Sequence, residues 1–134
     1  MPLTLTRRFV FSAAHRLESP ALDAAAQAAC FGPCVRTHGH NYRFEVAVSG
    51  EADPRTGFFA NVMELDAVVR RMLIDRWDHS LLNDHPEFAG AVVTMETIAG
   101  TAWRQLEPAL RARGLRLARI LVAETDEHWV ELTP

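Results

Sequence analysis

Residues 38–49, HGHNYRFEVAVS, alternate two kinds of side chain along their whole length. On a β-strand, residues two apart point to the same face of the sheet. The even positions carry histidine, tyrosine, phenylalanine and valine, whereas the odd positions include Asn41, Arg43 and Glu45. The pattern therefore predicts a half-buried strand with His38 and His40 at one end of its apolar face.

A second strand is predicted from Leu3 to Ala14, which is enriched in threonine, phenylalanine and valine. Its odd positions continue through Phe9 and Phe11 to His15, so this histidine also extends the apolar row of its strand. If the two strands are neighbours, three imidazoles converge at one end of the sheet. Gly39, between two of them, permits close approach of the backbone.

Three converging histidines favour an open zinc site, because a catalytic zinc takes three protein ligands and keeps a fourth position for water or substrate. A single histidine on an apolar face is more often a core residue than a ligand, so the prediction depends on all three. Cys34 precedes His38 by four residues and places a thiol beside the site.

The two cysteines, Cys30 and Cys34, also allow a rival zinc site that includes thiolates. Three histidines already form a catalytic set, so we expect Cys30 to be a spare buried thiol. Two other histidines, His85 and His128, are expected to lie at the surface.

Composition restricts the class of protein. The chain has 134 residues, of which 49% are hydrophobic and 23% charged, and is expected to form a single domain spanning 1–134. A net charge of -3 gives no basic footprint for nucleic acid. All 14 basic residues are arginine, so any phosphate clamp must use guanidinium groups. No long apolar run or signal peptide is evident, so we expect a cytoplasmic protein with no membrane partner.

The remaining segments predict one short helix, two long helices and two further strands. Arg16 to Thr37 is a long connection in which Ala21 to Ala29 favours a short helix. Asn61 can cap a helix that ends near Trp77, and its predicted apolar face comprises Val62, Leu65, Val69, Leu73 and Trp77.

Thr94 can cap the second long helix, which Pro108 should kink or restart and Gly114 should end. Strands are predicted over Leu115 to Thr125 and Trp129 to Leu132. The element order is therefore β-β-α-α-β-β.

Several motifs together resemble the 6-pyruvoyl tetrahydropterin synthases and the related 6-carboxytetrahydropterin synthases, over nearly the whole chain. The motifs are FSAAHRL at 11–17, Cys34 followed by HGHNY at 38–42, DPRTG at 53–57, Asp78-His79 with Leu82-Asn83 behind it, and Glu124-Thr125. The resemblance implies an α+β T-fold, with an antiparallel four-stranded sheet and two helices on one face. It also implies assembly around a central barrel, usually as a hexamer of two trimers with active sites at subunit interfaces.

The resemblance also implies roles for individual residues. His15, His38 and His40 would bind Zn²⁺. Cys34 would be the catalytic base, with Asp78 and His79 forming a relay with it. Glu124 would anchor the pterin ring of the substrate, 7,8-dihydroneopterin triphosphate, and Thr94 lies in the run that contacts the pterin in the family. Arg16, Arg36 and Arg43 are candidates for binding the triphosphate.

Two products are possible for such a zinc-dependent lyase. The three-residue gap between Cys34 and His38 resembles the enzymes of queuosine biosynthesis, which favours 6-carboxy-5,6,7,8-tetrahydropterin as the product. Phe31-Gly32-x-Cys34 and Asn61 resemble the animal enzymes instead, which release triphosphate and keep a 6-pyruvoyl side chain. A non-catalytic pterin-binding T-fold protein and a structural zinc protein with Cys34 as fourth ligand are further alternatives.

Overall fold

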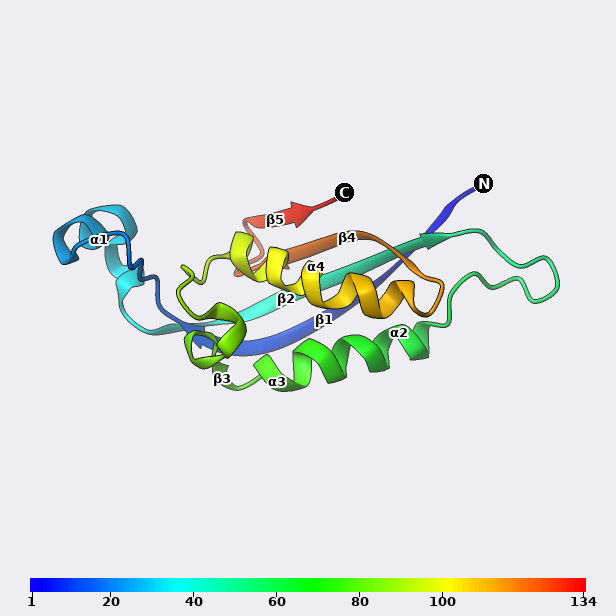
Figure 1. The fold of residues 1–134 in the computed structure, drawn as a ribbon, viewed down its shortest axis with the longest axis horizontal. Coiled ribbons are helices and arrows are strands. Elements are labelled where there is room, and N and C mark those ends of the chain that lie inside the picture. Colours follow the sequence, from blue (N-terminus) through cyan, green and yellow to red (C-terminus); the bar gives the residue numbers. More distant parts are fainter.

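The computed structural model describes all residues, 1–134, and consists of one five-stranded sheet with two long helical segments on one face (Figure 1). The strands lie in the order β3-β1-β2-β4-β5. Their bounds are β1 (Leu3–His15), β2 (His38–Gly50), β3 (Ser80–Leu81), β4 (Arg116–Ala123) and β5 (Trp129–Leu132). The predicted four-stranded antiparallel sheet is confirmed, and the short β3 adds a fifth strand, parallel to β1.

Four helices accompany the sheet, together with short turns of other helical types. The helices are α1 (Ala24–Phe31), α2 (Val62–Val69), α3 (Asp75–Trp77) and α4 (Met95–Arg111). A π turn covers Arg70–Ile74, and 3₁₀ turns cover Gly32–Val35, Leu82–Asp84 and Pro86–Phe88. None of the helices combines the length and the apolar character needed to span a membrane.

The α2 segment, the π turn and α3 form the continuous helical stretch predicted between Asn61 and Trp77. Buried residues recur every fourth position, at Leu65, Val69, Leu73 and Trp77. In an α-helix each such step rotates the side chain by about 40° away from its starting direction. The π turn has more residues per turn, so it keeps this row facing the sheet. The predicted apolar face begins one turn late, because Val62 is 43% exposed.

Helix α4 begins as predicted, with the Thr94 side chain accepting a hydrogen bond from Thr97 N–H. Pro108 was predicted to kink or restart the helix, and the restart is wrong, because a single helix continues through it to Arg111. Pro108 lies in the last turn, where its ring removes only one backbone donor. Gly114 ends the helical region as expected, with φ of 75°.

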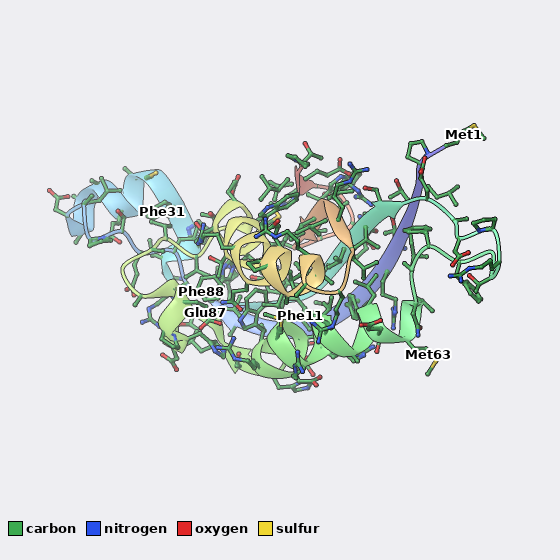
Figure 2. The ribbon with its side chains drawn as sticks, turned by 45° about the vertical axis from the view of Figure 1, so that its right-hand side comes forward. Met1, Phe11, Phe31, Met63, Glu87 and Phe88 are labelled. Carbon is green, nitrogen blue, oxygen red and sulfur yellow. The ribbon has the colours of Figure 1, made fainter.

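The core lies between the two long helical segments and the face of the sheet formed by the odd positions of β1 and the even positions of β2. Phe11 lies at its centre (Figure 2), stacked on Tyr42 at 5.0 Å between ring centroids and 6.0 Å from Trp77. By contrast Met63, also labelled in Figure 2, points outward and is 78% exposed. The predicted strand parity is thus confirmed.

Helix α1 extends beyond the end of the sheet (Figure 1) and has no buried side chains. Asp23 caps it by accepting a hydrogen bond from Ala26 N–H at 2.8 Å. Cys30 on this helix is exposed. The prediction that Cys30 is a buried thiol is therefore wrong, because α1 does not pack against the core.

The Glu87 carboxylate ties the segment after β3 to the end of α3. Its Oε1 lies 2.8 Å from Arg76 Nη2 and accepts a hydrogen bond from the Trp77 indole at 3.1 Å, and its side chain is 11% exposed. Burial would raise the pKa of Glu87, but hydrogen bonds from Arg76, its own backbone and Trp77 outweigh burial and lower the pKa to about 2.

We expect Glu87→Gln to lower the free energy of unfolding by about 2 kcal/mol at neutral pH. Because the folded pKa lies below the ordinary value of 4.5, this stabilisation is complete above that value and is lost as the pH falls towards 2. Urea unfolding of both proteins across that range measures it. Glu51→Gln, at an exposed carboxylate, is the control. A deficit that stayed constant down to pH 2 would contradict the assignment to the charged carboxylate.

Candidate metal centre and active site

The three predicted histidines converge at the α1 end of the sheet. In the β1–β2 register His15 lies opposite His38, and Ala13 lies opposite His40. One ring nitrogen from each histidine lies within 4.8 Å of the others. The register explains this convergence, because alternate residues of two antiparallel strands share one face.

Backbone carbonyls orient two of these rings. His15 Nδ1 lies 2.7 Å from the Val93 carbonyl oxygen, and His38 Nδ1 lies 2.7 Å from that of Arg36. A carbonyl oxygen only accepts, so each Nδ1 carries the proton and each Nε2 presents a lone pair. This is the tautomer that a metal-binding histidine uses through Nε2.

Other buried polar atoms of the site lack partners. His15 Nε2, His40 Nε2 and the Tyr42 hydroxyl are all buried without a hydrogen bond. Burial is also the main cause that lowers the pKa of His15 and of His40. Both imidazoles are therefore neutral at neutral pH, which is the form that binds a metal. The donor set fits a metal ion held by three histidines.

Glu124 lies against the cluster. It follows the last residue of β4, Ala123, so the predicted extension of this strand to Thr125 is wrong. Its Oε1 is 3.6 Å from His15 Nε2, and its Oε2 is 3.9 Å from His40 Nε2. The side chain is 18% exposed. The carboxylate therefore faces the cluster from the end of the neighbouring strand.

Two further histidines were both predicted to be exposed to solvent, and only one of them is. His128 is 58% exposed, as predicted, yet its Nε2 lies 3.9 Å from Glu124 Oε2. This contact was missed, because it depends on the turn between β4 and β5. His85 was predicted to be solvated, which is wrong: it is half-buried, and its Nε2 lies 2.8 Å from the Ser80 hydroxyl.

Cys34 lies in the 3₁₀ turn Gly32–Val35 and is half-buried. Its carbonyl accepts a hydrogen bond from Leu17 N–H at 2.8 Å, which holds the turn beside the residues that follow β1. The set of residues able to hold a metal includes neither Cys34 nor Cys30. This geometry does not support the alternative of a structural zinc site with Cys34 as fourth ligand.

Asp78 and His79 form the predicted pair. Asp78 Oδ2 lies 2.9 Å from His79 Nδ1, and Asp78 Oδ1 accepts a hydrogen bond from Ser12 N–H at 2.9 Å. These bonds, with that from Ser12 the larger, lower the pKa of Asp78. His79 is 81% exposed with φ of 58° and lines an open cleft of about 490 Å³ together with His40. No hydrogen bond joins it to Cys34 within one chain.

Thr94 lies next to the centre, because it follows the residue whose carbonyl holds His15. Its hydroxyl is 3.3 Å from Thr97 N–H and caps α4. This cap fixes the position of Val93, and through it the His15 ring. Contact between Thr94 and substrate stays a prediction.

A second cleft of about 580 Å³ is lined both by residues of the centre and by arginines. Its lining includes His40, Glu124, Arg43 and Arg8. Of the three arginines that the sequence offered as triphosphate ligands, only Arg43 lines this cleft. Arg8 was missed, since it lies far from the histidines in sequence and reaches the cleft through its register position opposite Glu45.

Fold and site together define an α+β protein in which three histidines able to hold a metal ion lie beside an acidic residue and two clefts. The chain belongs to the 6-pyruvoyl tetrahydropterin synthase family, whose model matches residues 4–134. The implied T-fold is therefore confirmed.

Individual relatives agree with this assignment. A 6-pyruvoyl tetrahydrobiopterin synthase of Dictyostelium discoideum is 38% identical and is matched over 94% of this chain and 92% of its own length. The solved structure of 6-pyruvoyl tetrahydropterin synthase from Caenorhabditis elegans superposes with a TM-score of 0.92 at 30% identity, covering 100% of this chain and 96% of that one. A putative 6-carboxy-5,6,7,8-tetrahydropterin synthase of Archaeoglobus fulgidus is 30% identical over 74% of this chain and 77% of its own.

Proposed function

We propose that the protein is a zinc-dependent lyase that acts on 7,8-dihydroneopterin triphosphate, releases triphosphate and keeps a 6-pyruvoyl side chain on the product. The carrying observation is the three-histidine centre, in which the buried Nε2 atoms of His15 and His40 have no protein partner. An all-imidazole set with an open position is typical of catalytic zinc.

The choice of product differs from the one that the sequence favoured. Relatives named 6-pyruvoyl tetrahydrobiopterin synthase match more of this chain, at higher identity, than the putative 6-carboxy enzyme does. The 6-carboxy product remains the second candidate, on the short gap between Cys34 and His38.

Each side chain of the site has a separate role in the proposed reaction. Bound zinc supplies Lewis-acid activation of the side-chain hydroxyls of the substrate. Cys34 acts as a thiolate and takes the proton from the substrate carbon that bears the activated hydroxyl. Asp78 holds Nδ1 of His79, which leaves the other ring nitrogen free to pass a proton. Glu124 accepts hydrogen bonds from the 2-amino and ring N–H groups of the pterin.

Phosphate recognition is assigned to the arginines of the second cleft. Arg8 and Arg43 share this cleft with His40 and Glu124. Guanidinium groups match phosphate oxygens bidentately. Glu45 pairs with Arg8 at 2.9 Å and lies 3.8 Å from Arg43, so it offsets part of their charge before substrate arrives.

The active site requires more than one copy of the chain. His79 is exposed and makes no contact with Cys34 within one chain, so a second copy is needed to bring the thiol and the relay together. The face of the sheet opposite the helices leaves Val10 66% and Trp129 47% exposed. A hexamer of two trimers, with this face lining a central barrel, would cover both side chains.

A product assay tests the proposal. Zinc-loaded protein is incubated with 7,8-dihydroneopterin triphosphate, and the pterin product is examined by mass spectrometry alongside a test for acetaldehyde. We expect triphosphate release, a retained three-carbon side chain and no acetaldehyde. Acetaldehyde with a 6-carboxy pterin would establish the second candidate instead. Binding of the substrate without any turnover would favour a non-catalytic pterin-binding protein.

A further inference from the structure

Glu45 is a buried carboxylate on the face of the sheet opposite the helices (Figure 1). It is only 6% exposed, and arginine side chains from both neighbouring strands surround it. Arg8 Nε donates a hydrogen bond to Glu45 Oε2 at 2.9 Å, and Arg119 Nη2 donates one to Oε1 at 2.9 Å. Burial would raise the pKa of Glu45, but hydrogen bonds from Arg119 and Arg8 outweigh burial and lower the pKa. The carboxylate is therefore charged at neutral pH.

Glu45 occupies one of the edges through which Arg8 can bind a phosphate. A guanidinium group binds phosphate oxygens bidentately through two neighbouring N–H groups. Nε and Nη2 of Arg8 both lie 2.9 Å from Glu45 Oε2, so this edge is taken. The Arg8 side chain is 64% exposed and lines the cleft of about 580 Å³. A phosphate in the cleft can therefore reach Arg8, but it competes with Glu45 for this edge.

Arg43 has an unused donor beside the same carboxylate oxygen. Its Nε is buried without a hydrogen bond and lies 3.8 Å from Glu45 Oε2. A buried donor without a partner is costly, so this nitrogen favours any acceptor that comes closer. The rest of the guanidinium is held in place, because Nη1 lies 3.4 Å from Asp126 and the group stacks 5.5 Å from the ring centroid of Trp129. A small rotation of Glu45 away from Arg8 would close the gap to Arg43 Nε.

We propose that Glu45 exchanges partners when a triphosphate binds in this cleft: the carboxylate leaves Arg8 for Arg43 Nε, and Arg8 turns its freed edge to the phosphates. The inference rests on the proposed assignment of phosphate recognition to this cleft, and it makes Glu45 the residue that sets the affinity. Glu45 stays paired with Arg119 through its other oxygen in both positions. Because the carboxylate competes for Arg8, it weakens the binding of released triphosphate and so favours departure of that product.

Calorimetric titration of zinc-loaded protein with inorganic triphosphate tests the proposal without reference to turnover. Glu45→Gln keeps the shape of the side chain and removes the competing charge, so we expect the dissociation constant of triphosphate to fall about three- to tenfold. Glu131→Gln is the matched control. Glu131 pairs with Arg119 at 3.2 Å, so this variant removes the same charge from the same cluster while leaving the pair of Glu45 and Arg8 intact. It should keep the triphosphate affinity of the unaltered protein.

Two further measurements show whether the effect passes through Arg8 and concerns phosphate alone. Arg8→Met should weaken triphosphate binding, and adding Glu45→Gln to that variant should give no gain, because the contested guanidinium is absent. Dihydroneopterin, which lacks phosphates, should bind equally well to the unaltered protein and to Glu45→Gln.

Equal or weaker triphosphate binding by Glu45→Gln, with thermal unfolding showing that the variant is folded, would overturn the exchange. So would an equal gain in Glu131→Gln or in the Arg8→Met background, or unchanged triphosphate binding by Arg8→Met alone. Triphosphate that bound to none of the proteins would refute the phosphate assignment of the cleft and the exchange with it. Failure of the proposed lyase function has a separate signature, which is binding of 7,8-dihydroneopterin triphosphate without any product.

Discussion

Replacing His38 by alanine is expected to lower zinc affinity more than about a hundredfold and to abolish turnover. Loss of a residue that merely orients a ligand costs about 10- to 100-fold in metal affinity, so loss of a ligand should cost more. His38 suits the test, because it lies half-buried at the first residue of β2. His15, by contrast, is 1% exposed, and its removal would also disturb packing.

The measurement is the zinc content of the purified protein, followed by chelator competition and thermal unfolding with and without zinc. The unaltered protein should be stabilised by zinc, since a ligand that binds only the folded state raises the free energy of unfolding. The His38→Ala variant should lose most of that increment. His85→Ala removes a half-buried histidine outside the cluster and should retain full zinc binding. Stoichiometric, tight zinc in His38→Ala would refute the three-histidine centre.

The sequence predicted the convergence of the three histidines because the information is local. In β1 and β2 the side-chain period of two places His15, His38 and His40 on the same face as Phe11 and Tyr42. Pairing these strands in register then brings the rings together. The same periodicity predicted which face of the sheet is buried, and therefore the two-layer arrangement.

The surroundings of the ligands were less predictable, because they depend on segments distant in sequence. Glu124 reaches the cluster only after β4 pairs with β2, through a register that shifts between Ala47 and Val48. Val93 orients His15 from the connection before α4. The resemblance placed Glu124 at the site, but periodicity within one strand does not give contacts with other segments. The contacts of Glu124 with His15 and His40, and of Val93 with His15, could therefore be seen only in three dimensions.

Helical details were missed for a related reason. The i, i+4 recurrence of Leu65, Val69, Leu73 and Trp77 indicated a helix but not the π turn that keeps the row aligned. The alanine-rich α1 has a strong helical propensity, which says nothing about packing. The sequence therefore predicted α1 correctly as a helix and Cys30 incorrectly as buried.

Cys34→Ala is expected to lower turnover by about 10²- to 10⁴-fold, the usual contribution of a general base, while zinc content stays unchanged. Zinc should remain because Cys34 is not among the residues of the cluster. His79→Ala should lower turnover similarly, since the relay that Asp78 orients would be lost. Unchanged turnover in Cys34→Ala would contradict the catalytic role, and lost zinc would instead assign the thiol to the metal.

Pairing these two variants tests whether neighbouring subunits share an active site. Within one chain Cys34 lies in the turn before β2, whereas His79 is 81% exposed beside Ser12. If each site takes its thiol from one subunit and its histidine from another, random co-assembly of Cys34→Ala and His79→Ala chains restores both groups in about a quarter of the sites. Co-expressed, co-purified mixed assemblies should therefore regain roughly that fraction of the unaltered turnover, while each variant alone keeps only its residual turnover. If both groups came from one subunit, every site would lack one of them, and mixing would restore nothing.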